Sequence, residues 1–287
     1  MVPPLRVVPA EPPGGSRAVT EGHLLEMFSS FQGEGPLAGL RQIFVRLSGC
    51  HLRCVYCDTP ESWERSAGWR IEVAPGARAF EERANPVTSD DVLETIRAWE
   101  GRVRHHSVAF TGGEPLLQPD FVRSLAEGAR SLGLKTYLDT SGTLAPNLKS
   151  VADAIDIFAL DLKLPSCPGV RLDWEDARRC LEAVRGREAF VKIVILEDSD
   201  PDEVARAARL VRETDPAIRL VLQPVTPVSD ATVEPSGRTL ATLRQRFLHP
   251  GIAGEAWLKE SSLSSSRNYT SSPVGCRAGL RIRPSTI

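Results

Sequence analysis

Residues 42–59 read QIFVRLSGCHLRCVYCDT, and this stretch decides the fold because it joins an apolar run of strand length to three cysteines. The cysteines have the spacing Cys-x3-Cys-x2-Cys: Cys50, Cys54 and Cys57. Thiolates this close in the chain indicate metal binding. Three of them leave one iron of a [4Fe–4S] cluster without a protein ligand, where a small molecule can bind and react. A structural zinc site is the alternative, and it needs a fourth ligand such as His51 or Cys167.

Outward from the cysteines, apolar runs alternate with amphipathic helical patterns, and the runs lack polar alternation, which is typical of strands buried on both faces. The predicted strands are Ile43–Leu47, Ser107–Thr111, Leu134–Asp139, Asp156–Leu162, Phe190–Leu196 and Ile218–Gln223. The predicted helices are Ser89–Glu100, Asp120–Leu132, Pro146–Ala152, Asp173–Val184, Asp202–Glu213 and Thr239–Leu248. Six successive βα units predict an α/β fold, a partial (β/α)6 parallel barrel. A doubly wound open sheet is the alternative, because strand order cannot be read from the sequence.

Composition and flanking segments predict the domain organisation. The chain has 287 residues, 41% hydrophobic and 25% charged, and a formal net charge of −2, which gives no reason to expect nucleic acid or a membrane as partner. We expect a disordered lead-in over 1–20, a catalytic domain over 21–250 and an atypical, disordered Ser-rich tail over 251–287. Residues 66–85 are predicted to form an inserted loop. Because the sequence contains neither a membrane-length apolar run nor a signal-peptide pattern, we expect a cytoplasmic protein.

The cysteine spacing resembles that of the radical S-adenosylmethionine superfamily, and a second motif supports the resemblance. Gly112-Gly113-Glu114-Pro115 follows a predicted strand and precedes a helix. In that superfamily this turn lets the backbone approach the methionine end of the cofactor. Further polar segments follow strand ends, at the edge where parallel α/β folds carry active sites. These segments are Thr140-Ser141-Gly142, Asp161-Leu162-Lys163 and Gln223-Pro224-Val225-Thr226. The resemblance implies the radical-SAM type of barrel, a [4Fe–4S] cluster and S-adenosylmethionine.

The residues before the cluster narrow the resemblance. Residues 26–35, EMFSSFQGEG, together with 42–59, resemble the 7-carboxy-7-deazaguanine synthase family, and the likeness runs from about Leu24 to Leu248. It implies a carbon–nitrogen lyase of queuosine-precursor biosynthesis, which contracts the ring of 6-carboxy-5,6,7,8-tetrahydropterin to 7-carboxy-7-deazaguanine and releases ammonia. It also implies Mg²⁺, a homodimer, and an electron donor such as a flavodoxin or ferredoxin.

The same resemblance assigns roles to matching positions, and none is catalytic because the radical is generated on the cofactor. The implied substrate contacts are Phe31, Gln32, Gly33, Arg46 and Thr111. The implied cofactor contacts are Tyr56, Asp58, Gly113, Glu114, Ser141, Lys163, Gln223, Pro224, Val225 and Thr226. Thr59 matches the magnesium ligand, a hard oxygen donor. Arg46 matches the residue that meets the substrate carboxylate, which a planar guanidinium binds through two hydrogen bonds.

The chain departs from the family at two places. Asp161-Leu162-Lys163 stands where many members have Ser-Pro-Lys, and the family's C-terminal segment, with a proline that reaches the substrate, is not found after Leu248. Natural divergence and a shifted reading frame both remain open as explanations of the tail, and either could leave a catalytically impaired enzyme. Two other functions stay as alternatives: a glycyl-radical enzyme activase, which shares the cysteine spacing, and a non-enzymatic zinc-binding module.

Overall fold

The computed structural model describes residues 19–170, 172–196, 199–225 and 256–258. Its centre is a run of six parallel strands, each paired with the next along the chain. The strands are β3 (Arg41–Leu47), β7 (Ser107–Gly112), β8 (Lys135–Thr140), β9 (Ile157–Asp161), β10 (Glu188–Ile195) and β11 (Arg219–Pro224). They belong to a ten-stranded sheet with the order β12-β11-β10-β9-β8-β7-β3-β2-β4-β5.

The strand order decides between the two predicted architectures. A doubly wound sheet reverses its order at a switch point, whereas here successive parallel strands always add on the same side. The right-handed crossovers therefore place every connecting helix on one face. The α/β fold with six parallel βα strands of the partial-barrel type is confirmed. Over the described residues the sheet stays open, with β12 (Ala256–Leu258) at one edge.

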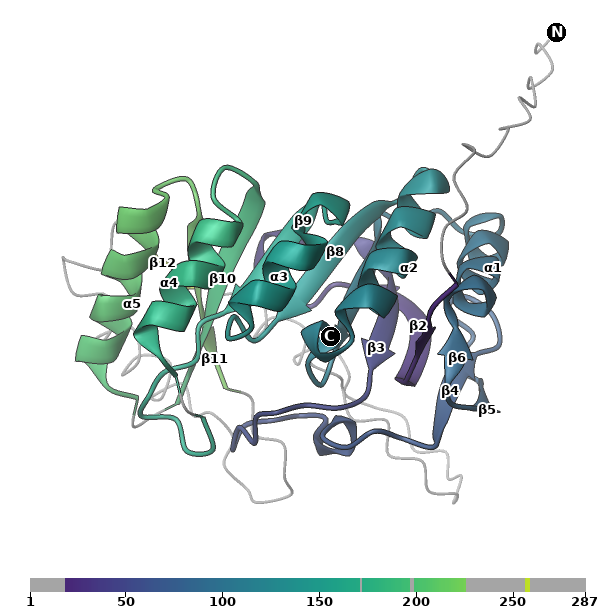
Figure 1. The fold of residues 1–287 in the computed structure, drawn as a ribbon, viewed down its shortest axis with the longest axis horizontal. Helices are drawn as coiled ribbons and strands as arrows, with labels where there is room; N and C mark the ends of the chain where they lie inside the picture. Colours follow the sequence, from purple (N-terminus) through teal and green to yellow (C-terminus); the bar gives the residue numbers. More distant parts are fainter. Residues whose placement is uncertain (1–18, 171, 197–198, 226–255, 259–287) are drawn as a thin grey trace, which may run out of the picture.

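The five α-helices of the described residues lie side by side over one face of the sheet (Figure 1). They are α1 (Ser89–Glu100), α2 (Pro119–Ser131), α3 (Ala145–Val151), α4 (Trp174–Ala183) and α5 (Pro201–Thr214). Thr88, Asp173 and Asp200 are the N-caps of α1, α4 and α5, since each side chain accepts a hydrogen bond from a backbone N–H in the first turn. The predicted helix Thr239–Leu248, residues 1–18 and most of the tail lie outside the described residues.

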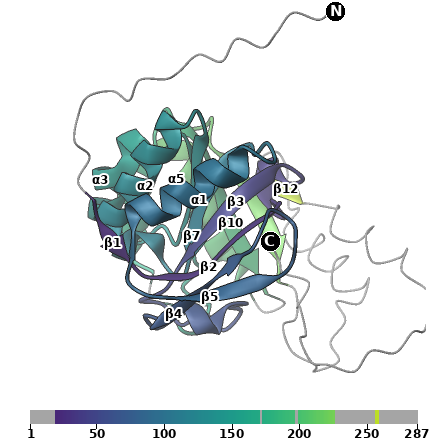
Figure 2. The ribbon, with the colours of Figure 1, turned by 90° about the vertical axis from the view of Figure 1, so that its right-hand side faces the viewer.

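The structure corrects the sequence analysis on the amino-terminal side of the sheet. Residues 66–85 are not an inserted loop: β4 (Gly68–Glu72) and β5 (Phe80–Ala84) form an antiparallel hairpin at the sheet edge (Figure 2). Pro75 and Gly76 lie in the turn of this hairpin, where the buried Glu72 carboxylate accepts hydrogen bonds from the backbone N–H groups of Gly76 and Arg78. A strand that was not predicted, β2 (Leu24–Phe31), pairs antiparallel with β3 and parallel with β4.

Short elements complete the order. Strand β1 (Glu21–Gly22) pairs with β6 (Val87–Thr88) in a separate two-stranded sheet. The 3-10 helices are η1 (Gly35–Leu37), η2 (Pro60–Ser62), η3 (Pro115–Leu117) and η4 (Ala152–Ala154). In the part of the chain that the structure describes, every helix is too short or too polar to cross a lipid bilayer.

The sheet has an apolar layer on each face. The larger core lies between the sheet and the helices. On the opposite, inner face a smaller cluster forms an apolar floor against which Leu37 packs: Phe28, Phe44, Ala109, Tyr137, Ile157, Ala159, Phe190 and Val221. Two residues further along the six parallel strands the same inner face becomes polar, because side chains of one face recur with period two. These polar positions are Arg46, Thr111, Asp139, Asp161, Lys192 and Gln223, and they line a cavity above the floor.

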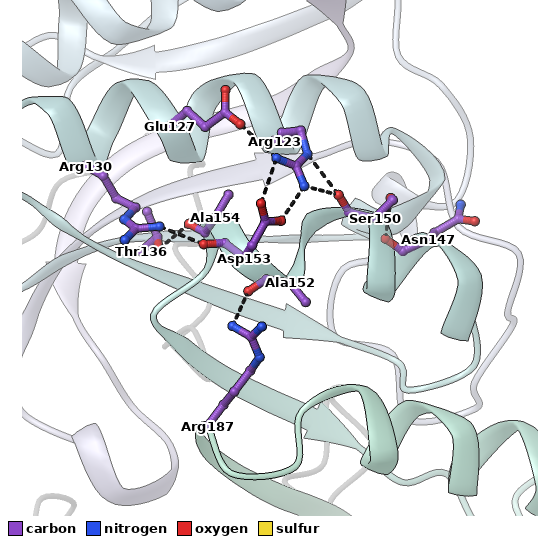
Figure 3. Close-up of polar contacts among 10 residues, drawn as sticks. All are labelled: Arg123, Glu127, Arg130, Thr136, Asn147, Ser150, Ala152, Asp153, Ala154 and Arg187. Carbon is purple, nitrogen blue, oxygen red and sulfur yellow. Dashed lines mark hydrogen bonds and ion pairs between the residues drawn. The ribbon is translucent and has the colours of Figure 1, made fainter. Parts of the chain in front are cut away.

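Three arginines fix the end of α3 and η4 on the helical side, away from that cavity (Figure 3). Arg123 of α2 donates to the carbonyl of Ser150 and pairs with Asp153. Arg130 donates to the Asp153 carbonyl and Arg187 to the Ala152 carbonyl, both at 2.7 Å. Cationic groups stabilise the carbonyl end of a helix, so these contacts hold the helical layer in place over β8 and β9.

Candidate functional site

The three clustered cysteines lie in the loop that follows β3. Backbone hydrogen bonds fasten this loop at both ends: Gly49 N to Ser62 O at 2.7 Å and Cys50 N to Trp63 O at 2.9 Å. A third, from Arg53 N to Gly169 O at 3.2 Å, ties its middle to the loop after β9. All three thiols face one cavity of about 200 Å³, at the carboxyl edge of the parallel strands. Backbone contacts therefore hold the loop at both ends and in its middle.

The donor set fits an iron–sulfur cluster better than a single metal ion. Among the described residues, no group of three or more His, Cys, Asp or Glu side chains is arranged to hold one ion. A cluster spreads its irons, so its thiolates need not converge on a point. Burial, the largest influence, raises the pKa of Cys50 and of Cys54. These thiols keep their protons at neutral pH until iron displaces them.

The glycine turn after β7 packs directly against the cysteine loop. Gly113 N donates to Leu47 O at 3.0 Å, and Glu114 N donates to Gly49 O at 2.9 Å. The buried Glu114 carboxylate accepts from Thr140 Oγ1 at 2.7 Å and from Ser141 N at 2.8 Å. Glu114 therefore links the ends of β7 and β8, and its carboxylate is occupied by these bonds.

Two buried oxygens that belong to cavity-lining residues have no hydrogen-bond partner: Gln223 Oε1 and Asp161 Oδ1. A buried acceptor without a donor costs free energy, on the order of 1–3 kcal/mol, so such atoms indicate a missing ligand. Donors of an amino acid or nucleoside group would satisfy both. The residues present thus fit S-adenosylmethionine bound above the thiols.

Comparison with known proteins identifies the family. Residues 44–214 match the Radical SAM superfamily. A 7-carboxy-7-deazaguanine synthase from Geobacter sulfurreducens is 41% identical over 209 residues, which cover 72% of this chain and 83% of that protein. One from Thermococcus kodakarensis is 35% identical over 219 residues, 71% of this chain and 84% of that protein. The chain belongs to the 7-carboxy-7-deazaguanine synthase family.

Membership in this radical SAM family implies a [4Fe–4S] cluster and S-adenosylmethionine. Among solved structures, QueE from Escherichia coli aligns with a TM-score of 0.49 at 23% identity, over 79% of this chain and 91% of that one. The sequence matches to the family do not favour the activase and zinc-module alternatives.

The cavity brings together most of the positions that the family resemblance assigned. Its lining includes Gln32, Arg46, Cys50, Cys54, Tyr56, Cys57, Asp58, Thr111, Gly113, Ser141, Lys163, Gln223, Pro224 and Val225. Four assigned residues lie outside the lining: Phe31, Gly33, Thr59 and Glu114. Phe31 is 58% exposed, and its ring lies under the Arg41 guanidinium. Thr226 lies beyond the described residues, and the individual roles stay predictions.

The guanidinium of Arg46 is held by a carboxylate that sequence reasoning did not single out. Glu26 of β2 is 8% exposed and accepts from Arg46 Nε at 2.8 Å. Its other oxygen pairs with Arg70 of β4 at 2.5 Å. A terminal nitrogen of Arg46 lies 3.5 Å from Thr59 Oγ1, which donates to Asp58. Glu26 on β2, which Arg70 of β4 also contacts, thus orients the Arg46 side chain toward the cavity.

A charge cluster on the inner face joins residues that sequence reasoning missed, Glu34, Asp139 and Lys192, to Asp161 and Lys163, which it had singled out. Lys192 Nζ lies 2.5 Å from Glu34, 3.8 Å from Asp161 and 3.9 Å from Asp139. Lys163 Nζ lies 2.5 Å from Asp161. Burial alone would lower the pKa of both lysines, but the nearby carboxylates outweigh burial and raise it. A charged residue within an apolar strand run is the sequence signal for this cluster, because a buried charge needs a partner.

Proposed function

We propose that this chain is a carbon–nitrogen lyase that converts 6-carboxy-5,6,7,8-tetrahydropterin to 7-carboxy-7-deazaguanine and ammonia. The observation that carries the proposal is Arg46, which faces the same cavity as the three thiols and whose Nε is held by the buried Glu26. Apart from a long contact of 3.5 Å from one terminal nitrogen to Thr59 Oγ1, the terminal N–H groups of the guanidinium remain for an anionic substrate, and a carboxylate matches them in two hydrogen bonds. A pterin that bears a carboxylate has the required group.

Bound together, the cluster and S-adenosylmethionine supply the radical that takes hydrogen from the substrate. The protein's own residues bind and orient. Gln32, 7% exposed, offers an amide, and its side chain already donates to Gln42 Oε1 at 3.0 Å and accepts from Glu34 N at 3.0 Å. The apolar floor excludes water beneath the ring, which protects a reactive intermediate.

The proposal also includes a magnesium ion, an electron donor and an oligomeric state. We assign Mg²⁺ to Thr59, as the family resemblance implies, with the substrate carboxylate as a second ligand; the distance of 3.5 Å between Thr59 Oγ1 and the Arg46 guanidinium supports a site shared with that carboxylate. We also propose a cytoplasmic homodimer reduced by a flavodoxin or ferredoxin, as the family resemblance implies.

An anaerobic assay tests the function. The chain is reconstituted with iron and sulfide, then given reductant, S-adenosylmethionine, Mg²⁺ and the carboxypterin. The expected product has the ultraviolet spectrum and mass of 7-carboxy-7-deazaguanine. Cleavage of S-adenosylmethionine to 5′-deoxyadenosine without that product would contradict the substrate assignment while leaving the superfamily unaffected.

The proposal predicts a specific effect of Glu26→Gln. Without the carboxylate, Arg46 loses a charge-assisted hydrogen bond of about 1.5–3 kcal/mol and its fixed orientation, so KM for the pterin should rise roughly ten-fold or more with little change in kcat. Arg70→Gln is the matched control, because it removes the other ion-pair partner of Glu26. The Arg70 side chain is 54% exposed, so this variant should leave KM within about two-fold of wild type. Equal KM values for wild type and Glu26→Gln would show that Glu26 does not position Arg46.

A further inference from the structure

We infer that Asp139 is the proton-transfer residue of this cavity, which accepts a proton from substrate carbon and delivers it to the departing ammonia. The inference rests on the proposed ring contraction and adds a residue role to it. None of the positions matched to the family includes Asp139. The argument comes from its place on the sheet, its neighbours and the balance of the reaction.

The register places Asp139 in one row with the proposed carboxylate site. Arg46 pairs with Thr111 across β3 and β7, and Phe110 pairs with Leu138 across β7 and β8, so Asp139 stands beside Thr111. Neighbouring strands are about 4.8 Å apart, so the row spans roughly 10 Å of the inner face. With its carboxylate on Arg46, the substrate places the carboxylate-bearing carbon and the adjacent methylene along this row, next to Asp139.

Asp139 is the carboxylate of the charge cluster that is open to a substrate. Asp161 has an oxygen 2.5 Å from Lys163, and Glu34 has one 2.5 Å from Lys192. Asp139 has only Lys192 at 3.9 Å among the described residues, beyond hydrogen-bond distance, and its side chain is 25% exposed on the cavity wall. Three carboxylates share two ammonium groups, and Asp139 is the least compensated of them.

The same surroundings set the proton affinity of Asp139. Burial, the largest influence, raises its pKa, Lys192 opposes the shift, and the charges of Asp161 and Glu34 add to it, giving a value of about 6. Lys163 opposes it more weakly. By contrast, despite its burial, the two lysines lower the pKa of Asp161. A general base works best when its pKa lies near the working pH, which singles out Asp139.

The overall reaction needs such a group. Ring contraction turns a methylene of the reduced pterin into a pyrrole C–H, so one hydrogen leaves that carbon as a proton and its electron pair enters the new double bond. The bond between the ring N–H and the fused ring breaks as a C–C bond forms between that ring and the carboxylate-bearing carbon, and the hydrogen taken from that carbon returns to the nitrogen, which becomes an amino group. The amino group then leaves with the electron pair of its remaining C–N bond and takes up the proton to become ammonia. Atoms and electrons balance with no added oxidant. One carboxylate that first accepts and then donates the proton satisfies both steps.

Asp139→Asn tests the inference, with product and 5′-deoxyadenosine measured separately. Lys192 keeps Glu34 as its partner, so the variant should fold. Because a general base contributes roughly 10²–10⁴-fold, product formation should fall at least about 100-fold, while S-adenosylmethionine cleavage in the presence of substrate stays within about two-fold. Asp139→Glu retains a carboxylate and should recover product to within about ten-fold of wild type. Asp153→Asn, at an exposed position on the helical side, is the matched control and should be as active as wild type.

The pH dependence gives a readout that a structural role would not move. The base must be ionised, so kcat/KM of the wild type should fall as the pH drops through about 6, and this acidic limb should be absent in Asp139→Asn. Normal product formation by Asp139→Asn beside an active wild type would overturn the inference and leave the function standing. Loss of 5′-deoxyadenosine as well, or equal losses in the Asn and Glu variants, would also overturn it. A wild type that makes no product would overturn the function and with it the inference.

Discussion

Replacing Cys54 by alanine is expected to abolish product formation while the fold remains. Cys54 is one of three thiols on the wall of a single cavity, and two thiols cannot hold a cluster that needs three. The loop keeps its shape without the metal, because the hydrogen bonds of Gly49, Cys50 and Arg53 are made by the backbone. The loss should therefore appear in iron content and turnover and be nearly absent from the free energy of unfolding of the apo chain.

Cys180→Ala is the matched control for the loss of a thiol. Cys180 is buried in α4, 1% exposed within the helical core, and plays no part in the site. Its replacement should cost about 1 kcal/mol of stability and leave the iron content and the turnover per cluster unchanged. Iron and sulfide analysis with the anaerobic assay checks both variants. A Cys54→Ala protein with a full cluster and wild-type turnover would contradict the assignment of the ligands.

Gly113→Ala is expected to destabilise the chain and to impair cluster assembly together. A Cβ atom at this position would lie 2.4 Å from Gly49 O and 2.6 Å from Ser62 O. Both contacts are backbone atoms of the cysteine loop, so no flexible side chain can move aside. Overpacking typically costs about 1–3 kcal/mol, and displacing fixed backbone should bring the loss to at least about 2 kcal/mol.

Urea denaturation of the apo chain measures that loss, and iron binding reports on the loop. Gly101→Ala is the control: this residue ends α1 with φ −65°, and a Cβ there would meet its nearest atoms at 3.6 Å. Its stability should be unchanged or slightly higher, since alanine restricts the unfolded chain. If Gly113→Ala matches Gly101→Ala in stability and iron content, the close packing of the glycine turn on the cysteine loop is not what holds the site.

The parallel strands and their helices were predictable because each signal is local. Buried strands such as β9, whose first four residues are all apolar and buried, are short apolar runs, and capping residues such as Asp200 mark where helices begin. The hairpin β4–β5 was not predictable in the same way. Every residue of β5 is exposed and β4 is only five residues long, so the pairing partner supplies the order that the local sequence does not.

In the candidate site, too, the residues in local motifs were predictable and those that depend on long-range contacts were not. The cysteine spacing and the glycine turn lie within short stretches, and their juxtaposition across β3 and β7 follows from a parallel sheet. Glu26 and the Lys192 cluster depend on contacts between distant positions, 158 residues apart for Glu34 and Lys192. The sequence signal for these contacts is a charged residue within an apolar run, and this signal does not identify the residue of opposite charge. Asp139, which ends its predicted strand, looked like a strand boundary residue.

The transfer of deuterium from the pterin tests the central claim most directly. Substrate labelled at the carbon that bears the carboxylate is incubated anaerobically with the reconstituted chain, reductant, S-adenosylmethionine and Mg²⁺. If the open iron and Arg46 serve one cavity as proposed, the label appears in 5′-deoxyadenosine or S-adenosylmethionine, and 7-carboxy-7-deazaguanine forms. Unlabelled 5′-deoxyadenosine beside unchanged pterin would contradict the account.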